Sequence, residues 1–350
     1  MRERYEPKLN APVEESPLDT QGFERPRELM ERVAEDLASL LELANRPVIS
    51  ARQFERDQIV QLCRLAARYE TQPQMINRPL TGKILISAFY EPSTRTRLSF
   101  ESAWHRLGGD VMSITDPSST GIAKGESLQD IGEMLNHYGD LVVLRDSDEN
   151  AVYEMLQTLR IPIVNAGNGV DEHPTQALAD VYALLKWRPG LAETGVAPPA
   201  RIGIVGVPAR MRTVRSLLTC LTHFSDGLDE IVIVADHDEP FAPGQRKDLE
   251  EKGLRLAVTD DLDDTLASLD VVYINAIAWT SAGFEEMGAH YRLHADSPFK
   301  PGAIVLHPLA RGAELDPNLD STPHNWYFAQ ARGAVFIRMA LLSAMLRTYV

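Results

Sequence analysis

The spacing of apolar residues along the chain changes between two periods. Short apolar runs of strand type alternate with stretches in which apolar residues recur three and four positions apart, as on one face of a helix. Alternation of this kind is typical of parallel sheets covered by helices. The expected strands lie at 84–90, 111–114, 140–145 and 162–166, and then at 201–206, 230–235, 255–258, 270–275 and 303–306.

The connecting segments predict helices, two of which are long. One runs from about Thr175 to Trp187 and ends in Arg188-Pro189-Gly190, which we interpret as a hinge between two α/β halves. The other, over about 334–347, is strongly apolar. The pattern therefore predicts an α/β protein of two doubly wound parallel-sheet domains joined by interdomain helices. A chain of 350 residues is long enough for two domains.

The N-terminal 45 residues form an extension with a composition of its own. Residues 1–22 are polar and contain proline, so we expect a disordered tail. Residues 26–44 carry an apolar stripe on an acidic helix, which either packs on its own subunit or adds an oligomer contact. Transit peptides avoid acidic residues, so a transit peptide is not expected.

Composition excludes several classes of function. The formal net charge of −15 argues against nucleic acid or an anionic membrane as the main partner. The two cysteines show no Cys-x-x-Cys pattern and the nine histidines no metal-ligand spacing, so no disulfide framework and no metal site are expected. We find no signal peptide and no membrane span, and expect a cytoplasmic protein. The glycines near Gly203 lack dinucleotide-binding spacing.

The most informative segment is Ser-Thr-Arg-Thr-Arg at residues 93–97. It follows the apolar run that ends at Tyr90 and precedes a helical pattern that Gly108-Gly109 ends. These residues therefore occupy the first turn of a helix, where free N–H groups and the helix dipole favour an anion. A capped helix with two solvated arginines is the alternative. Three hydroxyls and two guanidinium groups at a strand exit favour a phosphate or other oxyanion site.

The segment Phe89–Glu101 resembles the carbamoyl-phosphate-binding segment of the aspartate and ornithine carbamoyltransferases. The resemblance runs from about Arg46 to the C-terminus. The sequence His-Pro-Thr-Gln at residues 173–176 is similar to the aspartate branch of the family. Four further blocks match in order: Lys124–Leu128, His173–Leu178, His307–Leu309 and Thr322–Phe328.

The resemblance implies a fold and a donor site. The last helix would cross back, giving a carbamoyl-phosphate-binding domain of residues 46–178 and 334–350 and an acceptor domain of residues 190–326. Thr96 and His173 would polarise the carbonyl, Gln176 would contact the carbamoyl group, and Arg145 would contact both phosphate and carbonyl oxygen. The implied catalytic residues are Thr96, Arg145, His173 and Gln176. The implied carbamoyl-phosphate ligands are Ser93, Thr94, Arg95, Thr96, Arg145, His173, Gln176 and Leu309.

The resemblance also implies shared sites and no metal or organic cofactor. Lys124, on a polar loop, would reach the active site of a neighbouring subunit, which implies a homotrimer or a multiple of trimers. The loop serine that the family uses appears here as Gly121, and Ser119 or Thr120 could substitute for it.

The acceptor half departs from the family. Arg212 matches the arginine that holds the acceptor's α-carboxylate, but Ala276 and Ala278 stand where aspartate-specific members have arginine and glutamine. Trp279 adds bulk nearby, and Ala310 replaces a proline that follows a cis peptide bond. We therefore expect an amine acceptor that bears a carboxylate but is not L-aspartate.

Two other interpretations stay open. The chain could be a genuine aspartate carbamoyltransferase in which another basic residue, such as Arg210, replaces the missing arginine. It could also be a catalytically silent homologue with a structural or regulatory role. Silent homologues are expected to lose donor-site residues, and this chain keeps them.

Overall fold

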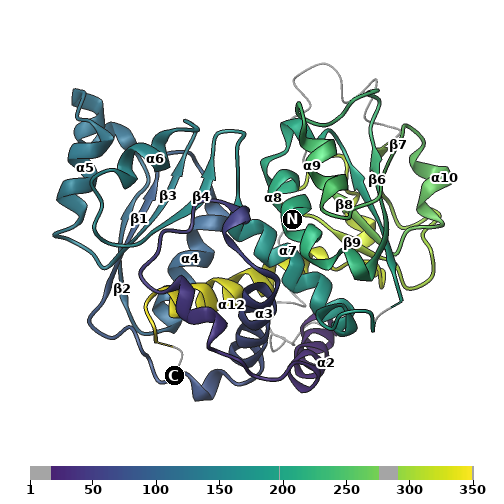
Figure 1. Ribbon diagram of the computed structural model, residues 1–350, viewed down its shortest axis with the longest axis horizontal. Coiled ribbons are helices and arrows are strands. Elements are labelled where there is room, and N and C mark those ends of the chain that lie inside the picture. Colours follow the sequence, from purple (N-terminus) through teal and green to yellow (C-terminus); the bar gives the residue numbers. More distant parts are fainter. Residues whose placement is uncertain (1–16, 197, 276–290, 349–350) are drawn as a thin grey trace, which may run out of the picture.

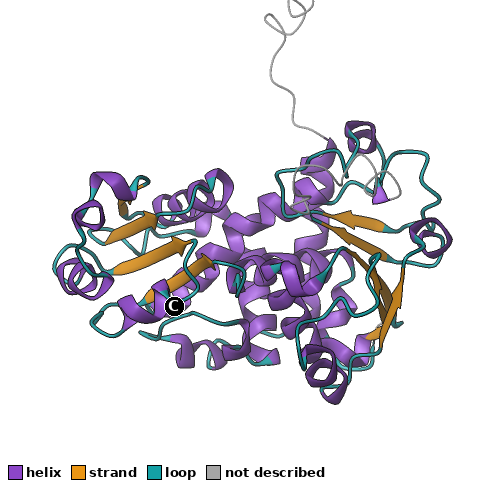
Figure 2. Ribbon diagram, turned by 90° about the horizontal axis from the view of Figure 1, so that it is seen from above, coloured by secondary structure: helices purple, strands orange, loops and turns teal. Residues whose placement is uncertain are grey.

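The computed structural model describes the backbone of residues 17–196, 198–275 and 291–348. Two lobes, each built around a sheet, lie on either side of a set of central helices (Figure 1). Seen from above, the strands of the two sheets occupy opposite ends of the molecule, with helices between them (Figure 2).

The first sheet contains four parallel strands in the order β2-β1-β3-β4. Apolar side chains project from both of its faces and are buried, which explains the nearly continuous apolar runs in the sequence. One face packs on α5 (Leu128–Leu135) and α6 (Ala151–Leu156), and the other on α3 (Arg56–Thr71), α4 (Thr94–Arg106) and α12 (Tyr327–Met345). The strands are β1 (Ile84–Phe89), β2 (Asp110–Ile114), β3 (Leu141–Asp146) and β4 (Ile163–Asn168).

The second sheet contains five parallel strands in the order β7-β6-β5-β8-β9. One face packs on α8 (Arg212–Leu221) and α9 (Gln245–Glu251), and the other on α10 (Leu262–Leu266) and on residues around 291–319. The strands are β5 (Ala200–Val205), β6 (Leu228–Val234), β7 (Leu256–Thr259), β8 (Val271–Ile274) and β9 (Ile304–Leu306).

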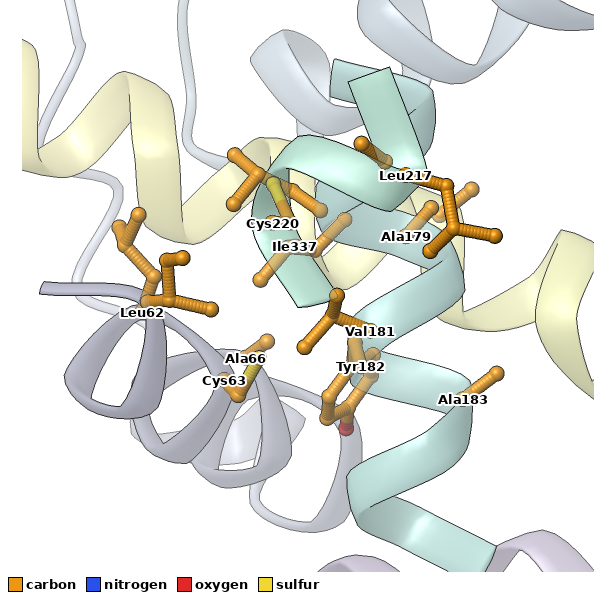
Figure 3. Close-up of a cluster of buried hydrophobic side chains, with 14 of the residues drawn as sticks. Leu62, Cys63, Ala66, Ala179, Val181, Tyr182, Ala183, Leu217, Cys220 and Ile337 are labelled. Carbon is orange, nitrogen blue, oxygen red and sulfur yellow. The ribbon is translucent and has the colours of Figure 1, made fainter. Parts of the chain in front are cut away.

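The core between the sheets is built from α3, α7 (Pro174–Trp187), α8 and α12. Figure 3 shows side chains from these helices meeting, among them Leu62, Tyr182, Leu217 and Ile337. α7 is buried along nearly its whole length, so it joins the lobes without a solvent-exposed face. The core includes the free thiols of Cys63 and Cys220, whose pKa values burial raises.

The structure confirms the expected two parallel-sheet domains, but the N-terminal helix differs from the prediction. α2 runs over Pro17–Arg32, so residues 17–22 are helical and the helix ends well before Ala44. The carbonyls beyond its end are taken by α3 side chains: Arg64 donates to Val33 and Gln61 to Ala34. A 3-10 helix, Ser39–Leu43, follows. α2 packs on its own subunit, with Leu29 fully buried.

No helix among the described residues has both the length and the apolar character that a membrane span requires.

Candidate active site

A cavity of about 1390 Å³ lies where the carboxyl ends of strands from both sheets approach one another. In parallel α/β proteins, loops at this edge commonly form ligand sites. Its lining includes five arginines against two carboxylates, so it is locally positive in a chain of formal charge −15. These charged lining residues are Glu91, Arg95, Arg145, Arg210, Arg212, Asp236 and Arg338.

The first turn of α4 forms one wall of the cavity. Ser93 precedes the helix in extended conformation, and its side chain makes no cap hydrogen bond, so the N–H groups of this turn stay available to a ligand. Thr94, Arg95 and Thr96 also line the wall, and burial lowers the pKa of Arg95. Arg97 is not part of the wall. Its guanidinium instead contacts Glu101, one turn later, at 3.2 Å.

Glu91 holds the two arginines that the sequence singles out. Its carboxylate accepts from Arg145 at 2.6 Å and from Arg212 at 2.7 and 2.9 Å, which ties the first sheet to α8. Burial alone would raise the pKa of Glu91, but the contacts with Arg212 and Arg145 outweigh it and lower that pKa. Burial, with the nearby Arg212, lowers the pKa of Arg145, and its Nε has no hydrogen-bond partner among the described residues.

His173 opens α7 and is buried beside this pair. Its backbone N–H donates to the Ser216 hydroxyl at 2.9 Å, which fixes the turn, while its Nδ1 has no hydrogen-bond partner in the part of the chain that the structure describes. Burial first, and the charge of Arg145 second, lower its pKa well below the ordinary value. The imidazole is therefore neutral near pH 7, and a neutral imidazole carries one N–H that can donate to a carbonyl oxygen.

A buried network fixes the amide of Gln176, one turn along α7. Its Nε2 donates to Asp180 at 2.7 Å, which leaves Oε1 free to accept from a ligand. The same carboxylate accepts from Gln330 of α12 at 2.6 Å and from the Tyr273 hydroxyl of β8 at 3.0 Å. Burial raises the pKa of Asp180 to about 7, against the hydrogen bonds that lower it.

The network continues to the loop after β9. The Gln330 carboxamide oxygen accepts from the His307 backbone N–H at 2.8 Å, and the His307 ring accepts from the Leu309 N–H at 2.8 Å. The peptide bond between Leu309 and Ala310 is cis, and Leu309 lines the cavity. Thus the orientation of Gln176 and the position of this loop depend on one connected set of hydrogen bonds.

Arg338 of α12 supplies a further buried charge. Its guanidinium donates to the Ser99 hydroxyl, which in turn donates to the Thr96 carbonyl at 2.8 Å. Its Nε has no partner within the described ranges. Burial lowers the pKa of Arg338 to about 9. Arg338 therefore adds positive charge behind the first turn of α4, from the far end of the sequence.

The structure brings together most of the residues that the sequence indicates, but not all of them. Lys124 is exposed in a 3-10 helix, Gly121–Lys124, and does not line the cavity of its own chain. Ala276 and Ala278 lie outside the described residues. Within the described ranges, no group of three or more His, Cys, Asp or Glu is placed to hold a metal ion. The indicated residues that line the cavity are Ser93, Thr94, Arg95, Thr96, Arg145, His173, Gln176, Arg212 and Leu309.

Sequence reasoning missed Glu91, Asp180 and Arg338 as parts of the site. Glu91 lies inside the matched segment Phe89–Glu101, but nothing local indicates that it contacts two arginines. Asp180 and Arg338 have a clearer signal, because each is a charged residue among the apolar positions of a mostly apolar helix. Asp180 also follows Gln176 by four residues, the spacing at which side chains on a helix meet.

Comparison with known proteins agrees with this site. Residues 46–186 match the family description "Aspartate/ornithine carbamoyltransferase, carbamoyl-P binding domain", and residues 200–345 match "Asp/Orn binding domain" of the same family.

Whole-length relatives agree as well. The aspartate carbamoyltransferase catalytic subunit of Methanopyrus kandleri is 36% identical over 315 residues, which cover 87% of this chain and 98% of the relative. That of Chromobacterium violaceum is 34% identical over 312 residues, 87% of this chain and 98% of the relative. The crystal structure of aspartate transcarbamoylase from Trypanosoma cruzi with carbamoyl aspartate and phosphate superposes with a TM-score of 0.79 at 32% identity, covering 88% of this chain and 98% of that one. This chain belongs to the aspartate/ornithine carbamoyltransferase family.

Proposed function

We propose that this protein transfers the carbamoyl group of carbamoyl phosphate to the amino group of L-aspartate, releasing phosphate. The observation that carries the proposal is one positive cavity that holds Arg95, Arg145, His173 and Gln176 together at the carboxyl ends of strands. The relatives named above, all aspartate carbamoyltransferases, support aspartate as the acceptor. This choice replaces our expectation from the sequence that the acceptor is a different amine.

The donor side of the reaction follows from the contacts. The phosphate would lie on the first turn of α4, within reach of Arg95 and Arg145. The neutral His173 would donate to the carbamoyl carbonyl oxygen, and the Gln176 oxygen, fixed by Asp180, would accept from the carbamoyl NH₂. These groups would hold the carbonyl still and stabilise the oxyanion as it forms.

The transfer itself needs no covalent enzyme intermediate. The uncharged amine attacks the carbamoyl carbon, the bond from that carbon to the phosphate oxygen breaks, and the departing phosphate takes the amine's proton. The products are a ureido compound and inorganic phosphate. The arginines that line the cavity would balance the charge of the leaving phosphate.

A second candidate acceptor is an amine with one carboxylate and a neutral remainder. The observation that favours it is the pair Ala276 and Ala278, which offer neither charge nor hydrogen-bonding side chains. Arg212 would bind the single carboxylate.

One assay distinguishes the candidates. The carbamoyl-phosphate-dependent formation of ureido product would be measured with L-aspartate and with a panel of amino acids, and kcat/KM compared. We expect L-aspartate to give the highest value. A higher value for an acceptor with one carboxylate would favour the second candidate.

Thermal-shift titration with carbamoyl phosphate and with phosphate controls the assay, and Arg95→Ala is the variant that we expect to lose binding of both. No product with any amine, together with no shift in the wild type, would indicate a catalytically silent homologue.

A further inference from the structure

Arg210 lies at the wall of the cavity that the second sheet provides. It ends a 3-10 turn, Pro208–Arg210, directly after β5, and it lines the cavity two residues before Arg212. Its side chain is exposed, and within the described part of the chain it has neither an ion pair nor a hydrogen bond.

The backbone that carries Arg210 is held in place. The Ala209 N–H donates to the Pro240 carbonyl at 3.0 Å, the Arg210 N–H to Val207 at 2.9 Å and the Met211 N–H to Pro208 at 3.1 Å. The first of these bonds joins the turn to the loop after β6, whose Asp236 and His237 also line the cavity, and the other two close the turn itself. The backbone of Arg210 is therefore fixed at the cavity edge, and no residue that the structure describes holds its guanidinium.

Three of the other cavity arginines, Arg145, Arg212 and Arg338, already contact protein groups. Arg212 directs Nη1 and Nη2 to Glu91 and also donates to the Gly169 carbonyl, and Arg145 contacts the same carboxylate. Arg95 lies in the first turn of α4, on the donor side. An acceptor with two carboxylates needs a cation for each of them, because an enclosed carboxylate without a counter-charge is costly.

We propose that Arg210 binds the side-chain carboxylate of the amino-acid acceptor, while Arg212 orients the α-carboxylate. This proposal rests on the proposed function, since it assumes a dicarboxylate acceptor. Arg210 would set the specificity for the acceptor, because it lines the cavity and has no ion pair among the described residues. A guanidinium donates two parallel hydrogen bonds to the two oxygens of a carboxylate. An amide of the same size has one oxygen and one NH₂ group, so it cannot accept both.

The test compares two acceptors of the same shape, L-aspartate and L-asparagine, in the wild type and in Arg210→Met. We expect the substitution to lower kcat/KM for L-aspartate about 10- to 100-fold, the loss of one charge-assisted interaction. The value for L-asparagine and the KM for carbamoyl phosphate should stay unchanged. Arg210→Lys should recover part of the aspartate value, because it restores the charge without the planar fork.

The control is Arg255→Met, which removes an exposed arginine of the same sheet that does not line the cavity. It should leave both acceptors unaffected. Equal loss for both acceptors in Arg210→Met, or no loss for either, would overturn the role of Arg210 while leaving aspartate as the acceptor. A wild type that does not carbamoylate L-aspartate would overturn the proposed function, and this inference with it.

Discussion

Asp180 should make the stability of the protein depend on pH in the neutral range. It is fully buried and accepts three hydrogen bonds, from Gln176, Gln330 and Tyr273, but no ion pair reaches it among the described residues. Its pKa is about 7 in the folded protein against an ordinary value of 3.8. Between these values the folded state binds a proton that the unfolded state has lost, so stability falls as pH rises and levels off above pH 7.

The magnitude follows from the two pKa values. From pH 5 to pH 7 the free energy of unfolding should fall by about 1.4 kcal/mol per pH unit because of Asp180. The total loss between pH 5 and pH 8 should therefore be about 2–3 kcal/mol. The substitution Asp180→Asn removes the charge and keeps the shape. Its oxygen can accept from Gln176 and Gln330, and its nitrogen can donate to the Tyr273 oxygen.

The assay is urea unfolding of both proteins at pH 5 and pH 8, with the free energy extrapolated to zero denaturant. We expect the free energy of unfolding of the wild type to fall by about 2–3 kcal/mol more than that of Asp180→Asn over this interval. Buried imidazoles such as His173 act in the opposite direction, but they are common to both proteins and cancel. Asp316→Asn is the control. Asp316 is partly exposed, and its pKa is lowered, chiefly by the Asn318 backbone N–H, so it is ionised at both pH values. Parallel pH dependence in wild type and Asp180→Asn would refute the reasoning.

Three further predictions test other parts of the site. Glu91→Gln should destabilise the protein by about 1–3 kcal/mol in urea unfolding, a range already reduced because solvent partly screens this carboxylate. Glu133→Gln, which breaks an exposed contact with an arginine, should have a much smaller effect, and an equal loss in both would show that the Glu91 contacts add nothing. His173 should stay neutral above pH 6, so the kcat/KM profile should show no limb from it between pH 6 and 8; a limb that His173→Asn abolishes would contradict this. Mixing inactive Lys124→Ala chains with inactive His173→Ala chains should restore some activity through hybrid sites, whereas no recovery after confirmed subunit exchange would mean that each site is built within one chain.

The fold could be predicted from the sequence because its signals are local. Apolar runs mark each strand, and Ser93–Arg97 lies at a strand-to-helix junction that can be recognised within about fifteen residues. The contacts that complete the site are not local: Asp180 meets Gln330 across 150 residues, and Arg212 meets Glu91 across 121. The predicted end of α2 is wrong for the same reason, since α3 side chains take the carbonyls of Val33 and Ala34 just beyond it. Ala276 and Ala278 lie outside the described residues, so the expectation drawn from them stays a prediction.

The position of α12 has a consequence for how the chain folds during synthesis. This last helix packs against α3, α4 and α7, and it connects Tyr69 to Ser343 and Ser99 to Arg338, pairs 274 and 239 residues apart. The sheet β2-β1-β3-β4 is complete in sequence by Asn168, yet the apolar surface that α12 covers on this domain stays open until α12 leaves the ribosome. At ~5–20 residues per second this interval lasts about 10–30 s. During that time the first half of the protein is an incompletely covered domain that lacks Arg338 behind the first turn of α4, and the final twenty or so residues complete it.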